Sequence, residues 1–403
     1  MVALLGLRIL GLEIAMPRLL PALILALAPQ GALANCGGSF EGFVRGLSTE
    51  AQSRGYDAGL VGSFFNGVRQ DAKVLRADRA QGVFKKDFVE FSRAVISAGR
   101  LQNGARNAQK YAAVLRRAEA EHGVSPGVLL AFWALETDYG AVQGDFNTLN
   151  ALVTLAHDCR RPELFRPQIF SALELYKRGD FDPRRTTGAW AGEIGQVQML
   201  PDDILRNGVD GDGDGHVTLK TSVPDALMTG ARMLRELGWR RGEPWLQEII
   251  VPEGLDWSQT GLNHEKPTGQ WAALGVRGRS APLAANLRGA ILLPMGRKGP
   301  AFMAYPNFRV YFEWNKSFVY VTTAAYFATR LEGAPVFDAG NPEPGLSDGE
   351  MKVLQKKLAA KGYDVGAIDG ILGEKTREAV QREQARLGLA ADAWPTKALL
   401  DRL

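Results

Sequence analysis

The stretch GVLLAFWALETDYG, residues 127–140, places a glutamate, Glu136, directly after a run of eight apolar residues. Ser125 and Pro126 precede the run and predict a helix start, with serine as the N-cap and proline at the first helical position. Gly140 predicts the end of the helix. Glu136 therefore falls in the last turn of a helix whose other residues favour burial.

The position of Glu136 suits acid–base chemistry. Phe132 and Trp133 precede it by four and three residues and share its face of the helix. Burial among apolar groups and the partial negative charge of the helix C-terminus both penalise the charged carboxylate, so we expect a raised pKa. Such a carboxyl group in a cleft can act as a general acid. The alternative is a solvent-facing glutamate that only ends the helix.

The composition indicates a globular chain with two or three domains. It has 403 residues, of which 46% are hydrophobic and 23% charged. The formal net charge of +4 is compatible with an anionic polymer as partner. Lysine and arginine form no basic stripe interleaved with aromatic residues, which argues against nucleic-acid binding.

Residues 1–34 are predicted to be a secretory signal peptide. Arg18 precedes an apolar run at 19–28, and a small-residue cleavage pattern follows. We therefore expect a periplasmic protein. Cys36 lies close to the cleavage site, but Asn35 is a poor fit to lipid attachment, so we expect no lipid anchor. No later apolar run reaches 18 residues, and the processed chain is not expected to span a membrane.

The only cysteines are Cys36 and Cys159. An even count in an exported protein favours a disulfide. The alternative is two unrelated buried thiols. Two cysteines and four histidines show no zinc-site spacing.

The pattern of residues 40–332 is mostly helical. Helical spacing predicts helices over 160–179, 222–239 and 308–331, and a short strand near 251–257. The segment around 334–345 is rich in proline and glycine and is predicted to be a linker to a second domain at 346–403.

Five motifs in residues 40–332 resemble the catalytic domain of the lytic murein transglycosylase B family. They are W-x-x-E-x-x-Y-G around Glu136, Gly144 with Thr154-Leu155, G-x-x-G-x-x-Q-x-x-P from Gly192 to Pro201, DGDGH at 212–216, and YPNFRVYFEWNKSFVYV at 305–321. The resemblance implies a mainly α, lysozyme-like transglycosylase domain with small β elements over residues 35–333.

The resemblance also implies roles for individual residues. Glu136 would be the single catalytic acid/base, and the substrate-binding residues would be Gln198, Arg161, Phe165, Trp314 and Tyr320. For the aromatic residues, the alternative is a place in the core. The sequence departs from the family at Ala189, where serine is usual, and at Glu193, which adds a second carboxylate.

The implied substrate is the glycan strand of peptidoglycan. Glu136 would protonate the β-1,4 bond between N-acetylmuramic acid and N-acetylglucosamine, and the muramoyl C6 hydroxyl would then close a 1,6-anhydro ring without water. Two alternatives stay open: a hydrolytic muramidase of the same fold with Glu193 as second carboxylate, and a non-catalytic wall-binding scaffold. We expect a monomer that needs no cofactor for its chemistry.

The segment 210–221 has the first half of a calcium-loop pattern. Asp210, Asp212 and Asp214 stand at positions 1, 3 and 5, and a glycine stands at position 6. His216 would contribute its backbone carbonyl, and the resemblance adds Asp225 as a late carboxylate. Position 12 is threonine, so the usual bidentate glutamate is missing. We expect a structural calcium ion; the alternative is a solvated acidic turn.

Residues 346–403 resemble the small three-helix peptidoglycan-binding domain of wall enzymes. The resemblance rests on Leu354-Gln355, Gly362-Tyr363, DGILGEKT at 369–376, Ala379-Val380 and Gly388-Leu389. It implies a second site for peptidoglycan strands. The alternative is a helical bundle that docks proteins in general.

Overall fold

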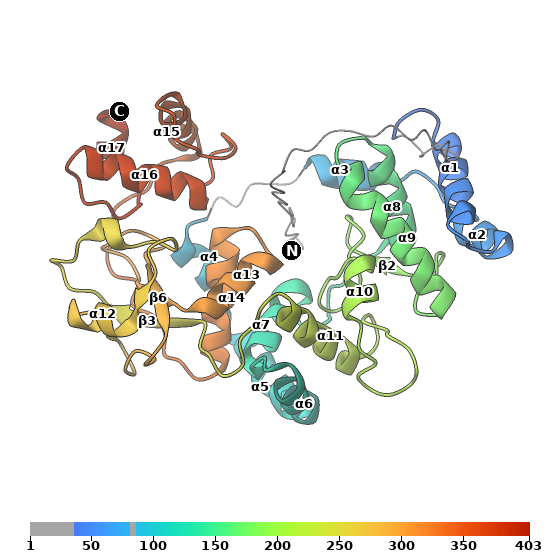
Figure 1. The fold of residues 1–403 in the computed structure, drawn as a ribbon, viewed down its shortest axis with the longest axis horizontal. Coiled ribbons are helices and arrows are strands. Elements are labelled where there is room, and N and C mark those ends of the chain that lie inside the picture. The colour runs from blue at the N-terminus through green and yellow to red at the C-terminus, as the bar shows by residue number, and fades with distance from the viewer. Residues whose placement is uncertain (1–35, 81–85) are drawn as a thin grey trace, which may run out of the picture. The chain divides into compact units, whose positions relative to one another are not determined.

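The computed structural model describes residues 36–80 and 86–403, so the predicted signal peptide lies outside the described residues. The chain forms two compact units, which are described separately. The first unit combines residues up to 81 with 140–229, and the second combines 82–139 with 230–403. Both are mainly helical, as predicted (Figure 1). Within the described ranges, no helix is both long and apolar enough to cross a bilayer.

The first unit consists of helices and one short antiparallel strand pair, β1 (Phe146–Asn147) with β2 (Thr187–Gly188). Its helices are α1 (Phe40–Ser53), α2 (Ala58–Phe65), α3 (Ala72–Arg79), α8 (Thr148–His157), α9 (Pro162–Arg178) and α10 (Pro201–Asn207). Helix α11 (Val223–Glu236) begins in this unit and ends in the second.

Helices α8 and α9 pack together at the centre of the first unit. Residues 148–156 of α8 are all buried. Phe165, Ile169 and Leu173 form the buried stripe predicted for α9. The helix ends at Gly179, whose φ of 87° is favourable only for a residue without a Cβ.

A disulfide joins Cys36, just before α1, to Cys159 between α8 and α9, with the two Cα atoms 5.1 Å apart. Close by, the carboxylate of Asp78 on α3 is buried and forms ion pairs with Arg160 and Arg161. These links fasten the N-terminal helices to the central pair.

The second unit contains a five-stranded antiparallel sheet and the remaining helices. The strands are β3 (Leu246–Ile250), β4 (Lys266–Pro267), β5 (Arg277–Gly278), β6 (Arg288–Leu292) and β7 (Phe302–Ala304), in the order β4-β6-β7-β3-β5. The helices of this unit that precede residue 334 are α4 (Phe88–Val95), α5 (Ala98–Lys110), α6 (Ala112–His122), α7 (Pro126–Thr137), η1 (Trp257–Gln259), α12 (Thr268–Ala273), α13 (Pro306–Trp314) and α14 (Phe318–Leu331).

Helix α7 is the predicted apolar helix, and residues 127–137 are all buried. It packs chiefly against α14. Ser125 is the N-cap residue as predicted, but its hydroxyl makes no capping bond and donates to the carboxylate of Glu332 instead. The same carboxylate accepts the Gly127 N–H at 3.1 Å, so Glu332 caps the helix.

The prediction of one helix over 308–331 is wrong in one respect. The helix is interrupted between Trp314 and Phe318, so two helices form, α13 and α14. The Asn315 side chain accepts the Ser317 N–H at 2.8 Å, and Ser317 then caps α14. Local side-chain bonds of this kind compete with helical ones. The strand predicted near 251–257 is also wrong: these residues form a turn that leads into η1.

The C-terminal residues form a small helical bundle, α15 (Asp348–Ala360), α16 (Glu374–Arg386) and α17 (Lys397–Asp401), shown in red in Figure 1. Its core is built from buried aliphatic residues, including Leu354, Leu358 and Val380. The predicted linker packs against earlier residues of the same unit. Phe337 is buried with its ring centre 4.8 Å from that of Tyr326, and the Asn341 N–H donates to the Lys298 carbonyl.

Replacing Cys36 by serine should lower the free energy of unfolding by about 2–4 kcal/mol, because the disulfide closes a long loop in the unfolded chain. Denaturant unfolding of the oxidised protein measures this loss. The double variant Cys36→Ser/Cys159→Ser should be no less stable than the single one. Two titratable thiols in unfolded, unreduced wild-type protein would contradict the bridge.

Candidate active site

The carboxyl group of Glu136 lies at the C-terminal end of α7 and is only 8% exposed. Two buried donors converge on its Oε1 atom. The Tyr320 hydroxyl donates at 2.6 Å and the Trp314 Nε1–H at 2.9 Å. The donors come from the two sides of the break between α13 and α14, so the corner at residues 314–320 is what holds the carboxyl group.

The environment of Glu136 acts on its charge in two directions. Burial favours the neutral carboxyl form, whereas donors aimed at one oxygen favour the carboxylate. Burial, followed by the neighbouring Glu136, raises the pKa of Tyr320 well above its usual range. The phenol therefore keeps its proton and remains a donor.

The end of α7 is fastened to α5. Asp138 and Tyr139 both adopt left-handed backbone conformations, with φ of 52° and 59°. Arg100 donates from Nε to Asp138 at 3.0 Å, and the Tyr139 hydroxyl donates to the Arg100 carbonyl at 2.9 Å. Left-handed non-glycine residues are strained and gather at functional sites. Neither Arg100 nor Asp138 is predicted from the sequence, since no local pattern marks this long-range pair.

Trp314 and Tyr320, which are predicted to bind substrate, have their rings packed in the core. Tyr320 is fully buried, and Trp314 is 7% exposed with its ring stacked on Phe132 at a centroid distance of 4.3 Å. Their ring faces are covered by the core, and their polar atoms point to Glu136. Both residues thus contact Glu136, and their predicted role in substrate binding stays a prediction.

Arg161 and Phe165 belong to the first unit, on or beside α9. Phe165 is 2% exposed and is therefore a core residue, which is the alternative named above. Arg161 pairs with the buried Asp78 and lies over the Phe165 ring at 5.1 Å. Burial lowers the pKa of the Arg161 guanidinium, while Asp78 and, more weakly, Glu193 oppose that shift. Glu193 thus lies near a cation.

Gln198 also belongs to the first unit and has an unusual backbone. Its φ is 51°, a strained conformation for a residue with a Cβ. The Nε2 atom donates to the Gly195 carbonyl at 2.8 Å and to the Gln143 carbonyl at 3.3 Å. The side-chain amide is therefore held in one orientation. The motif predicts this glutamine as a site residue, but nothing in the sequence indicates its strain.

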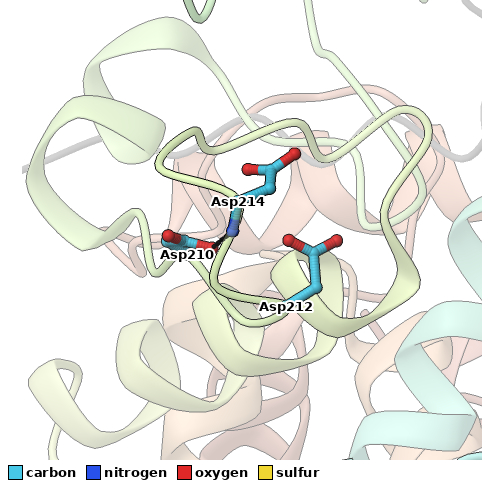
Figure 2. Close-up of side chains that lie close together, drawn as sticks. All are labelled: Asp210, Asp212 and Asp214. Carbon is cyan, nitrogen blue, oxygen red and sulfur yellow. Dashed lines mark hydrogen bonds between the residues drawn. The ribbon is translucent and has the colours of Figure 1, made fainter.

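The three aspartates of the predicted calcium loop come together. Figure 2 shows Asp210, Asp212 and Asp214 on one turn of the chain, and their carboxylate oxygens lie within 4.8 Å of one another. The backbone N–H groups of Gly213 and Gly215 donate to the two oxygens of Asp210 at 2.6 and 2.9 Å. Carboxylate oxygens at such spacing are ligands of the kind that Ca²⁺ prefers.

The side chains of Asp225 and His216 form hydrogen bonds at the borders of this loop. Asp225 is fully buried and outside the cluster, and its two oxygens accept the N–H groups of Gly211 and Thr218 at 2.9 and 2.7 Å. It therefore ties both ends of the loop to α11. The His216 ring bonds to Asp180 through Nδ1 at 2.9 Å, and this bond raises the pKa of the imidazole.

Two family profiles match this chain. The profile of the transglycosylase SLT domain matches residues 39–329. The chain belongs to this family. A second profile, that of the putative peptidoglycan binding domain, matches residues 347–403. The family predicted from the sequence motifs is confirmed, and so is the fold class.

Individual members of the lytic transglycosylase family are similar over different lengths. The membrane-bound lytic murein transglycosylase B of Escherichia coli K12 is 28% identical over 233 residues, which are 57% of this chain and 63% of that protein. SltB3 from Pseudomonas aeruginosa, solved in complex with NAG-anhNAM-pentapeptide, has a TM-score of 0.83 and 35% identity. That match covers 91% of this chain and 99% of SltB3.

The likeness to a third solved structure establishes the fold only. The lytic transglycosylase Slt35 of Escherichia coli, solved in complex with calcium, is 24% identical and has a TM-score of 0.63. The match covers 76% of this chain and 98% of Slt35.

Proposed function

We propose that this chain cleaves the β-1,4 bond between N-acetylmuramic acid and N-acetylglucosamine in peptidoglycan without water, and that Glu136 is the single acid/base. The observation that carries the proposal is the buried Glu136 carboxyl group with two donors on one oxygen. The product in the complex with SltB3, a NAG-anhNAM-pentapeptide, is of the kind that such a reaction forms.

The reaction needs one group to give a proton and then to take one. Protonated Glu136 gives its proton to the glycosidic oxygen as the bond from C1 to that oxygen breaks. The C6 hydroxyl oxygen of the muramoyl residue then bonds to C1, and its proton returns to Glu136. Burial supports the protonated form and the two donors support the carboxylate, so the group suits both steps. The intramolecular nucleophile also gains from proximity.

Gln198 would hold the sugar next to the reacting bond. Two backbone carbonyls fix its Nε2 atom, so its Oε1 atom can be aimed at a hydroxyl or N-acetyl group of the glycan. A pre-oriented amide loses little side-chain entropy when a sugar binds.

The hydrolytic alternative depends on Glu193. A second carboxylate would have to activate water opposite Glu136 or attack the sugar. The Arg161 guanidinium attracts Glu193 electrostatically, so Glu193 already has a charged partner within its own unit. The products separate the two reactions, because an anhydro end is one water lighter than a hydrolysed end.

We infer a periplasmic location and peptidoglycan strands as the partner of both domains. The second profile match supports wall binding by residues 347–403. The predicted domain limits, 35–333 and 346–403, lie within a few residues of the two profile matches.

Glu136→Gln should reduce the rate of glycan cleavage by a factor on the order of 10² to 10⁴, since it removes the proton donor. The measurement is mass spectrometry of products from purified glycan strands, where wild-type protein should form anhydro ends. Glu119→Gln, which changes an exposed glutamate of the same unit, is the control. Retention of more than half the wild-type rate by Glu136→Gln would rule out the assignment.

Tyr320→Phe should lower the cleavage rate about 10- to 100-fold, because a hydrogen bond to a charged group contributes about 1.5–3 kcal/mol. The matched control is Tyr326→Phe on the same helix, whose hydroxyl bonds to the Phe337 N–H and Arg330. Steady-state rates on soluble strands measure both. Equal rates in the two variants would show that the Tyr320 hydroxyl does not support Glu136.

We further propose that the loop at 210–216 holds a structural calcium ion. Asp210, Asp212 and Asp214 would supply side-chain oxygens, and His216 its backbone carbonyl. Asp225 would shape the loop without joining the ligands. A bound cation would neutralise the crowded carboxylates, and it takes no part in the cleavage step. The threonine at position 12 favours weak binding, near the millimolar range of extracellular modules.

Calcium should stabilise the folded protein by about 2.7 kcal/mol at a hundredfold excess over Kd. Thermal unfolding should therefore shift upward through millimolar calcium and respond less to magnesium. Asp212→Ala should abolish the response, whereas Glu163→Gln, which removes an exposed carboxylate elsewhere in the first unit, should keep it. A wild-type melting curve that neither calcium nor chelator moves would refute the site.

A further inference from the structure

The C-terminal bundle is docked on the catalytic part of the second unit through α16. Gln381 donates from Nε2 to the backbone carbonyls of Thr260 and Trp257 at 2.9 and 3.1 Å. One turn earlier, Arg377 donates from Nη2 to the Pro294 carbonyl at 2.7 Å and from Nη1 to the Leu293 carbonyl at 3.3 Å. The domain is thus held by buried side chains that bond to the backbone of its neighbour.

Arg377 is an unusual residue for a docking surface. Its guanidinium is buried, and the carbonyl groups that it contacts carry no full charge. Its Nε–H has no partner among the described residues. Burial lowers its pKa to about 9, with Asp392 opposing the shift, so the group is still charged at neutral pH. Burying an aliphatic side chain here would cost less desolvation free energy than burying a charged one. The shape and charge of the guanidinium therefore point to a specific role.

The guanidinium lies over the face of Phe318, with Cζ 4.1 Å from the ring centre. Phe318 is the first residue of α14 and is 5% exposed. It stands between Trp314 and Tyr320, the two donors to Glu136. A cation over an aromatic face is attracted to the ring, and this attraction limits the movement of the Phe318 side chain. Arg377 therefore covers the corner that holds the catalytic carboxyl group.

We propose that Arg377 is a positioning residue for Glu136, so that the C-terminal domain takes part in catalysis as well as in wall binding. Arg377 fixes Phe318, Phe318 fixes the corner between α13 and α14, and the corner aims Trp314 and Tyr320 at Glu136. The inference rests on the function proposed above. Its simplest rival is that Arg377 only attaches the domain.

Gln381 separates the two explanations. It shares the helix, the burial and the bonds to backbone carbonyls with Arg377. Its hydrogen bonds, however, go to Thr260, Trp257 and Ala391 rather than to the corner. Gln381→Met should weaken docking without moving the donors of Glu136. Arg377→Met should weaken docking and also disturb the donors.

The experiment uses the full-length mature protein, with soluble glycan strands as substrate and mass spectrometry to identify anhydro products. Arg377→Met should lower kcat about 10- to 100-fold, as small misplacements of catalytic groups do, with KM nearly unchanged. The limb of the pH–rate profile that reports Glu136 should move to higher pH, because a carboxyl group with weaker donors holds its proton more firmly. Arg377→Lys should recover part of kcat, and Gln381→Met should keep the wild-type kcat and profile.

The proposal is overturned if the wild-type protein is active and the Arg377→Met variant has the same kcat and the same pH profile. Equal losses of kcat in Arg377→Met and Gln381→Met would also overturn it, in favour of simple attachment. A wild-type protein that forms no anhydro product would instead refute the proposed function. If Arg377→Met does not fold, Phe318→Leu replaces it, since that variant keeps the carbonyl bonds of Arg377; an unchanged kcat there would equally refute the role.

Discussion

A carboxyl group buried at the end of an apolar helix must find its hydrogen-bond partners within the protein. Glu136 finds them in Trp314 and Tyr320, which are six residues apart in sequence and meet at one oxygen. A continuous helix would carry its side chains away along the axis by about 1.5 Å per residue. The break at residues 315–317 turns the chain so that both sides of the corner face the same atom.

Helix α14 and the residue that follows it hold α7 at both of its ends. Glu332, just beyond the end of α14, accepts the Gly127 N–H at the start of α7, while Tyr320 near the start of α14 donates to Glu136 in its last turn. These two polar contacts lie about two and a half turns apart on α7, so they restrict sliding and rotation of the helix along an otherwise apolar interface. Hydrophobic packing alone lacks that directional specificity.

Local signals made parts of this structure predictable. The serine–proline pair and the apolar run predict α7 and the position of Glu136, and the regular spacing of aspartates predicts the cluster at 210–214. The break between α13 and α14 could not be predicted in this way, because apolar residues continue at helical spacing on both sides of it. The buried roles of Trp314 and Tyr320 depend on Glu136, which lies 178 and 184 residues earlier in sequence. The bonds from Asp225 to the N–H groups of Gly211 and Thr218 span the aspartate loop, so they depend on how that loop folds. The docking of α16 likewise depends on backbone carbonyls about 80 to 120 residues earlier.

The two compact units are interleaved along the chain, since each is built from two separate stretches of sequence. A growing polypeptide that has reached residue 139 holds only the first portion of each unit, and neither core can close until later residues arrive. Contacts of such long sequence separation slow folding, because the entropy of large loops must be lost before the contacts form. Export of the chain in an unfolded state would remove this conflict, since the whole sequence is then available before either core begins to close. A nick between residues 139 and 140 would divide both cores at once, because each fragment would then hold part of each unit.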